Sequence, residues 1–376
     1  MIRLTVPSID ENDLQAVRDA LASGYLVQGA RVAAFEQAVA QYVGTKYAVA
    51  VSSCTAALHI SLLALAVQPG DLVIVTAYSW PATANVIELC GAKPVFVDIQ
   101  RDTFNMDPAC LKVVLEELMG SKQTRQRVKG ILPVHTFGQM ADMKVIMELA
   151  HQYGLPVIED AACALGATLH GRQAGTWGAL GCFSFHPRKA ITTGEGGMVV
   201  TDNEALARCL RALRNHGQDP QASSPDFIMA GFNYRMTEFQ AALGITQMAK
   251  LDSIIAARCR LAARYDRLLR NTTIKVPAVA SGSQHVYQSY VALLPAEVAG
   301  RRDEIIAGLK ERGIETTIGT WHIPMITYFR RRYGYKMGDF PATDETFACA
   351  MTLPLHKKLS EKEQEKIVEC LAAEIS

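Results

Sequence analysis

The chain is predicted to fold as an α/β protein with a mostly parallel central sheet flanked by helices, followed by a smaller C-terminal α+β domain. Between Tyr47 and Glu159, short apolar segments alternate with stretches of helical periodicity, a pattern typical of parallel sheets. After Thr201 the pattern becomes mainly helical. The chain has 376 residues, of which 49% are hydrophobic, so it can bury the cores of one large and one small domain.

The strands of the large domain are expected at residues 47–52, 72–76, 94–98, 128–134 and 155–159. The helices between them are expected to begin at residue 55, to run through 85–89, and to cover 107–119 and 143–153. Ligands of such sheets bind at the carboxyl ends of the strands. Ser52, Trp80, Asp160 and His186 lie at or just after strand ends, so we expect them to converge on one crevice.

A long helical pattern from Thr237 to about Leu269 is expected to lead into the small domain. We therefore place a large domain with an N-terminal arm at residues 1–245 and the small domain at residues 246–376. The small domain is expected to contain strands near 287–294 and a helix over 303–312. Its last helix should begin at Ser360, where Glu363 completes a capping box.

Composition argues against several classes of partner. Lysine and arginine number 38 and acidic residues 37, and no block of like charge suggests binding to nucleic acid or to a membrane surface. The nine cysteines are dispersed, which favours reduced thiols and argues against a metal site. The first residues lack a signal-peptide pattern, so we expect a cytoplasmic protein.

Lys189 is the most informative residue, because it stands between an apolar strand and a glycine-rich turn in FSFHPRKAITTGEGG, residues 183–197. A lysine alone in such a place is most often a solvated surface residue. Here it is accompanied by Asp160 after another strand, Trp80 after a third, and a helix that opens near Thr55. Together these supply an amine that can form an imine, a carboxylate for a ring nitrogen, an aromatic surface and an anion-binding helix start, which are the groups that pyridoxal phosphate requires.

The order of these segments resembles the DegT/DnrJ/EryC1/StrS family of aminotransferases over nearly the whole chain. The segments that carry the resemblance are residues 23–29, 52–59, 94–98, 157–162, 183–197 and 233–236. The resemblance implies a fold-type I enzyme that uses pyridoxal 5'-phosphate, with pyridoxamine 5'-phosphate as the intermediate form. It also implies transfer of an amino group from an amino acid, with glutamate as the expected donor, to a nucleotide-linked keto-sugar.

The run Thr192–Gly197 is similar to that of the branch that aminates C4 of a 4-keto-6-deoxy sugar. The dehydratase branch has histidine at the position of Lys189, so lysine favours transamination. Two alternatives remain open: amination of a cyclitol or another ketone, and a regulator that binds the cofactor without turnover.

The resemblance assigns catalytic roles to Lys189, which would bind the cofactor as an imine and transfer protons, and to Asp160, which would pair with the ring nitrogen. For this role Lys189 must be partly deprotonated near neutral pH. The alternative interpretation of Asp160 is a residue that merely ends a strand. The alternative for Lys189 is the solvated surface residue described above.

The cofactor phosphate is expected to bind the backbone at Thr55 and Ala56 and the hydroxyls of Thr55 and Ser184. Thr55 could instead be a simple N-cap. Trp80 matches the aromatic residue that stacks on the ring, although a packing role is the usual one for a lone tryptophan.

Two cysteines depart from the family pattern. Cys54 replaces a glycine of the phosphate loop. Cys163 stands where relatives carry glutamine or histidine near the ring hydroxyl, and it is either a weak hydrogen-bonding partner or a small buried apolar residue.

Three further residues are assigned by resemblance alone. Asn233 is expected to reach the cofactor phosphate of the neighbouring chain in a homodimer with shared active sites. Arg235 and His322 are expected to bind substrate.

Overall fold

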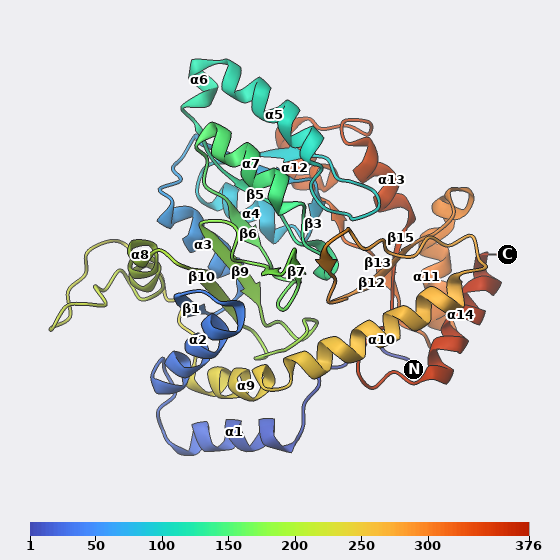
Figure 1. The fold of residues 1–376 in the computed structure, drawn as a ribbon, viewed down its shortest axis with the longest axis horizontal. Helices are drawn as coiled ribbons and strands as arrows, with labels where there is room; N and C mark the ends of the chain where they lie inside the picture. Colours follow the sequence, from blue (N-terminus) through green and yellow to red (C-terminus); the bar gives the residue numbers. More distant parts are fainter. Residues whose placement is uncertain (376) are drawn as a thin grey trace.

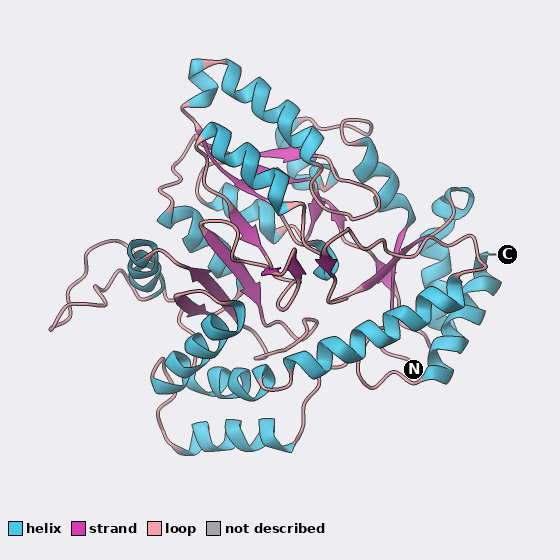
Figure 2. Ribbon diagram, in the orientation of Figure 1, coloured by secondary structure: helices cyan, strands magenta, loops and turns pink. Residues whose placement is uncertain are grey.

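The computed structural model describes residues 1–375 and contains a mixed sheet at its centre (Figures 1 and 2). Two sheets, of strand order β1-β10-β9-β6 and β4-β2-β5, are joined through bridges from Ile131 to Val157 and from Val134 to Asp160. Of these strands, β10 alone runs against the direction of the others. The predicted α/β fold with a mostly parallel sheet is therefore confirmed. The strands are β1 (Tyr47–Val51), β2 (Leu72–Thr76), β4 (Lys93–Val97), β5 (Val128–Leu132), β6 (Ile158–Asp160), β9 (Leu180–Ser184) and β10 (Gly197–Thr201).

Helices cover both faces of this sheet because successive strand side chains point to opposite sides. In β1, Ala48 and Ala50 belong to one core, while Val49 and Val51 belong to the other. The first core is covered by α2 (Ala30–Val43), α5 (Pro108–Gly120) and α7 (Met143–Tyr153), and the second by α3 (Cys54–Ala64), α4 (Ala82–Leu89) and α8 (Glu204–Arg214).

The helical run predicted from Thr237 to about Leu269 is two helices, α9 (Glu238–Met248) and α10 (Leu251–Leu269). The break at Ala249 and Lys250 was not predicted because apolar spacing continues on both sides of it. The first turns of α10 pack into the core of the central sheet and its last turns pack into a separate C-terminal core. In Figure 1 these two helices run along one side of the molecule toward the chain ends, with α1 (Glu11–Ala22) beside α9.

The C-terminal core surrounds a small antiparallel sheet in the order β12-β15-β13. Its elements are β12 (Tyr290–Leu293), β13 (Thr317–Ile318), β15 (Ala350–Leu353), α11 (Arg302–Glu311) and α14 (Glu361–Ile375). Ser360 and Glu363 form the predicted capping box at the start of α14. Ile2 also lies in this core, so the N-terminal residues pack against the C-terminal unit. The domain boundary between residues 245 and 246 stays a prediction.

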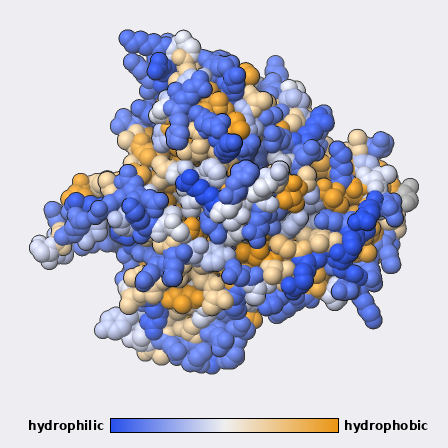
Figure 3. Space-filling view, in the orientation of Figure 1, coloured by the Kyte–Doolittle hydropathy of each residue, from blue (hydrophilic) through white to orange (hydrophobic). Residues whose placement is uncertain are grey.

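Short elements connect these units. They are β3 (Tyr78–Ser79), β7 (Thr168–Leu169), β8 (Arg172–Gln173), β11 (Ser283–Gln284), β14 (Trp321–His322), α6 (Lys122–Arg125), α12 (Thr327–Tyr333), α13 (Pro341–Cys349), η1 (Thr136–Gly138), η2 (Ala296–Arg301) and η3 (Ile323–Met325). On the face shown in Figure 3, hydrophilic side chains interrupt the apolar patches. None of the helices within residues 1–375 is long and apolar enough to cross a membrane.

Candidate active site

Strand pairing brings Lys189 and Asp160 to the same edge of the sheet. β6 and β9 are adjacent and parallel, with Asp160 opposite Cys182, so the segments that follow both strands leave the sheet at one end. Lys189 lies in the turn after β9, and its Nζ donates a hydrogen bond to Sγ of Cys163 at 3.0 Å. Cys163 belongs to the segment that follows Asp160. Residues from two strands therefore meet at one site.

The Asp160 carboxylate is buried, with 4% of the residue exposed. Its Oδ2 accepts a hydrogen bond from Oγ1 of Thr83 at 2.7 Å, and its Oδ1 accepts one from the Ala162 N–H at 3.2 Å. Burial raises the pKa of Asp160, although these two bonds and the charge of Lys189 oppose the rise. Within residues 1–375 the carboxylate has no ion-pair partner, and a protonated ring nitrogen would fit as that partner.

The neighbouring acid, Glu159, is a structural residue. Its carboxylate accepts hydrogen bonds from the backbone N–H groups of Gly175, Trp177 and Gly178 at 2.6 to 2.9 Å. It also lies 2.8 Å from Nε2 of His135, whose Nδ1 accepts from a backbone N–H, so Nε2 carries the proton and donates. The two consecutive acids thus have different roles, because strand alternation points their side chains to opposite faces.

The surroundings of Lys189 favour its charged form. Burial by itself lowers the pKa of this lysine, but the hydrogen bond to Cys163 and the charge of Asp160 favour the protonated amine, and the pKa is raised above its usual value. The chain's own residues therefore do not produce the partial deprotonation that we expected for this lysine. Burial is also the main reason that the pKa of the Cys54 thiol is raised, which keeps it protonated.

The helix start beside this site is capped by Ser53. Ser53 has an extended backbone, and its Oγ accepts a hydrogen bond from the Ala56 N–H at 3.1 Å. The alternative interpretation of Thr55 as a simple N-cap is therefore wrong, and the Thr55 residue is exposed. The remaining N–H groups of the first turn of α3 have no partners one turn earlier, as at any helix start, which suits a phosphate.

Gly197 brings the glycine-rich turn against this helix start. A Cβ at Gly197 would lie 2.4 Å from the carbonyl carbon of Ser53, so a larger residue could not approach. Gly197 is also opposite Ser184 in the pairing of β9 with β10. Ser184 therefore ends its strand near the start of α3, where its hydroxyl could bind the same phosphate.

Trp80 is 62% exposed and lies two residues before α4, the helix that carries Thr83. Its ring is thus available to a ligand at the Asp160 side of the crevice. The sequence analysis did not identify Thr83, although a hydroxyl in the first turn of the helix after Trp80 was a usable signal.

Asn233 and Arg235 lie on an extended segment between α8 and α9. Asn233 is exposed, and Arg235 donates a hydrogen bond to the Asn215 side chain at 2.7 Å. Between them, the Tyr234 carbonyl accepts a hydrogen bond from the Ser52 N–H at 2.8 Å. The segment therefore lies next to the helix start of its own chain, and the assignment of Asn233 to a neighbouring chain stays a prediction.

His322 is placed differently from the other predicted residues. Only 2% of it is exposed, and its Nε2 lies 2.7 Å from Oδ1 of Asp344. Burial lowers the pKa of His322, against the effect of Asp344. These contacts give the histidine a structural role in joining β14 to α13. Its role in substrate binding stays a prediction.

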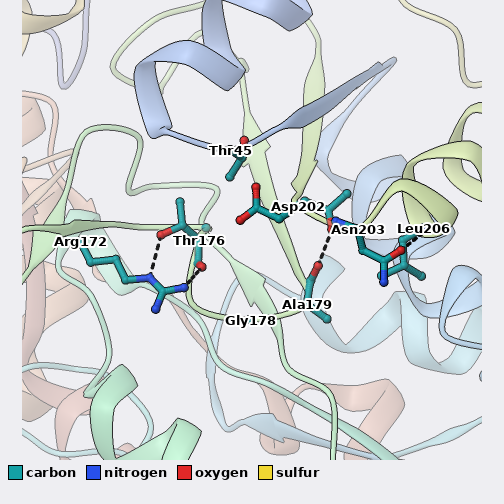
Figure 4. Close-up of a pocket in the computed structure, with 10 residues that line it drawn as sticks. Thr45, Arg172, Thr176, Gly178, Ala179, Asp202, Asn203 and Leu206 are labelled. Atoms are coloured by element: carbon teal, nitrogen blue, oxygen red, sulfur yellow. Dashed lines mark hydrogen bonds between the residues drawn. The ribbon is translucent and has the colours of Figure 1, made fainter.

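Figure 4 shows a hollow that is separate from this site. It has a volume of 380 Å³ and is lined by Arg172, which hydrogen-bonds to Thr176, and by Ala179 and Asn203 among others. Ala179 precedes the start of β9, whereas Lys189 follows the end of this strand. The hollow therefore lies near the amino-terminal end of β9, whereas Lys189 lies beyond its carboxyl-terminal end.

Comparison with known proteins agrees with this geometry. Residues 7–372 match the DegT/DnrJ/EryC1/StrS aminotransferase family. The chain belongs to this family. It is 37% identical to GDP-perosamine synthase of Caulobacter vibrioides over 374 residues, covering 98% of this chain and 97% of the relative.

Solved structures of this family have the same fold. Helicobacter pylori PseC, an aminotransferase involved in the biosynthesis of pseudoaminic acid, superposes with a TM-score of 0.92 at 26% identity, over 100% of this chain and 99% of the other. The pyridoxal-phosphate form of the putative sugar aminotransferase Spr1654 from Streptococcus pneumoniae has a TM-score of 0.92 at 29% identity, over 100% and 98% of the two chains. The protein is thus a fold-type I sugar aminotransferase that uses pyridoxal phosphate.

Proposed function

We propose that this aminotransferase moves an amino group from an amino acid, with glutamate as the donor, to C4 of a nucleotide-linked 4-keto-6-deoxy sugar. The observation that carries the proposal is the placement of an amine, Lys189, and a buried carboxylate, Asp160, that has no ion-pair partner in the described part of the chain, on segments at the ends of adjacent strands. The run Thr192–Gly197 and the similarity to GDP-perosamine synthase support amination at C4.

The residues of the chain fit the needs of the cofactor. When bound, pyridoxal phosphate supplies a ring that accepts electrons from the carbon next to the amino nitrogen. Asp160 would hold the proton on the ring nitrogen, because its buried carboxylate has no ion-pair partner among residues 1–375 and would gain from that contact. Lys189 Nζ would move the proton at the reacting carbon.

Other residues would bind the cofactor and the substrate and orient them. The start of α3, with the Thr55 hydroxyl, and the Ser184 hydroxyl would bind the phosphate. Trp80 would stack on the ring and exclude water from one face. Cys163 would contact the ring hydroxyl, and Arg235 the substrate.

A homodimer would cover two exposed apolar segments. Tyr25, Leu26 and Val27 are 79%, 43% and 61% exposed, and they lie next to the start of α9 through the bridge from Val27 to Thr237. The segment that projects after α8 carries the exposed residues 227–229 (Figure 1). Exposed apolar groups of this size mark protein interfaces. The nine free cysteines support a cytoplasmic location.

The test is incubation of the purified protein with glutamate and the UDP-, GDP- or dTDP-linked 4-keto-6-deoxy sugars, with products identified by mass spectrometry. We expect an aminated sugar nucleotide from one of them, and none with Lys189→Ala. If glutamate converts the bound cofactor to its aminated form but no nucleotide sugar is aminated, the proposed acceptor is refuted. Cyclitol ketones would then be tested in the same assay.

A further inference from the structure

A second cavity opens beside the turn that carries Lys189. Its volume is 540 Å³, within the range of small-molecule sites. Three segments far apart in the sequence form its wall: the N-terminal residues, the turn before Lys189, and the end of α11 with the residues that follow. The lining residues are Arg3, Leu4, Thr5, Pro7, His186, Pro187, Arg188, Ile306, Lys310, Glu315, Thr316 and Thr317.

The cavity is positively charged. Each of the three segments contributes one cationic side chain, namely Arg3, Arg188 and Lys310, and none of these is in an ion pair within residues 1–375. Glu315 is the one acidic residue of the lining, and its Oε2 accepts a hydrogen bond from the Leu4 N–H at 3.0 Å.

One buried polar atom of a lining residue has no hydrogen-bond partner among the described residues. This atom is the Oγ1 of Thr316. Burial lowers the pKa of His186, so its imidazole is neutral near pH 7 and the positive charge comes from the arginines and the lysine. A buried hydroxyl without a partner costs stability unless a ligand binds it.

The cavity wall and the reactive amine belong to one turn. The Lys189 N–H donates to the His186 carbonyl at 2.8 Å, and the Arg188 carbonyl accepts from Nε2 of Gln288 at 2.9 Å. The Lys189 side chain reaches Cys163, whereas the three residues before it line the cavity. A ligand held in the cavity would therefore contact the turn that carries the reactive amine.

We propose that this cavity binds the diphosphate of the nucleotide-linked substrate through Arg3, Arg188 and Lys310. The proposal rests on the function proposed above. A diphosphate has several anionic oxygens, so three cationic side chains on different walls of the cavity can each bind one of them. Charge-assisted hydrogen bonds of this kind to phosphate oxygens are strong. A single donor carboxylate has two oxygens, which one arginine can satisfy.

The test uses the cofactor-loaded protein and the variant Arg3→Gln/Lys310→Gln. Arg188 is left intact because it adjoins Lys189. Binding of GDP, UDP, dTDP and inorganic diphosphate is measured by calorimetry, and the response of the cofactor absorbance to glutamate is measured in parallel. Lys144→Gln, which removes an exposed lysine on α7, is the matched control.

We expect the double variant to bind inorganic diphosphate and the preferred nucleoside diphosphate roughly tenfold or more weakly, since each cation contributes a hydrogen bond to a charged group. The glutamate response and the Lys144→Gln control should stay unchanged. Equal nucleoside diphosphate binding by wild type and double variant would overturn the proposal and leave the proposed function standing.

Three other outcomes of this test bear on the proposal. A loss of the glutamate response without a loss of diphosphate binding would assign the cavity to the donor carboxylate and overturn the proposal. If the wild type binds inorganic diphosphate through these side chains but binds no nucleoside diphosphate, the anion site is supported and the nucleotide-linked substrate is refuted. Absence of both kinds of binding in the wild type would overturn the proposal.

Discussion

Replacing Thr83 by valine tests whether the chain holds Asp160 as a buried carboxylate. The substitution keeps the shape of the side chain and removes the hydroxyl that donates to Asp160 Oδ2 at 2.7 Å. Thr83 is 1% exposed, so water would not replace the lost donor. A hydrogen bond to a charged group contributes about 2 kcal/mol, against about 1 kcal/mol for a bond between neutral groups.

The loss of folding stability caused by Thr83→Val should depend on pH. The pKa of the Asp160 carboxyl is raised in the folded protein above the value of 3.8 that it has in the unfolded chain. Protonated Asp160 therefore stabilises the fold fully below pH 3.8, and this stabilisation is lost as the pH rises through the folded pKa. The Thr83 hydroxyl favours the ionised carboxylate, so its removal raises this pKa further. The free energy of unfolding should therefore fall by about 1 kcal/mol where Asp160 is protonated and by about 2 kcal/mol where it is ionised.

The measurement is urea unfolding of the cofactor-free protein at several pH values below and above the pKa of Asp160 in the folded protein. Thr76→Val is the matched control, because Thr76 is fully buried and its Oγ1 has no hydrogen-bond partner within residues 1–375. We expect this control to leave stability unchanged or to raise it. A loss in Thr83→Val that is equal at all pH values, or no larger than that of the control, would refute the reasoning.

Other predictions concern the cofactor and the shared site. Asp160→Asn should fold but lose roughly 100-fold or more of its single-turnover rate with glutamate, because a neutral amide cannot hold the ring proton; near-normal rates would remove Asp160 from the mechanism. Borohydride reduction should attach the cofactor mass to the peptide that carries Lys189, and the same mass on another lysine would contradict this assignment. Cys163→Gln should shift the pH at which the bound cofactor changes colour, and an unchanged pH together with unchanged affinity would leave Cys163 as a packing residue. Mixed dimers of Lys189→Ala and Asn233→Ala chains should regain activity if each site uses both chains, whereas mixed dimers as inactive as their parents would assign both residues to one chain.

Local patterns predicted many elements of this fold. α7 (Met143–Tyr153) and β2 (Leu72–Thr76) have the predicted bounds, because hydrophobic periodicity and helix-ending residues such as Gly154 are properties of the nearby sequence. The proximity of Lys189 to the segment after Asp160 was also predictable, since parallel strands place their carboxyl ends at one edge of the sheet.

Contacts between distant segments were not predictable in the same way. The sequence did not indicate that β14 pairs with β3 or that His322 contacts Asp344, and these contacts bury the histidine ring. The role of Thr83 depends on α4 packing against β6, whose last residue, Asp160, is 77 positions away in the chain.

The α/β class, the order of most strands and helices, and a set of residues that suit pyridoxal phosphate could be predicted from the sequence alone. These follow from side-chain periodicity and from residues at strand ends. The three-dimensional packing was needed to show that Glu159 is saturated with hydrogen bonds while Asp160 has no ion-pair partner within residues 1–375. It was also needed to show that Arg3, Arg188 and Lys310 line one cavity. The physical reason is that burial and charge depend on which distant segments pack together, and sequence spacing does not specify those neighbours.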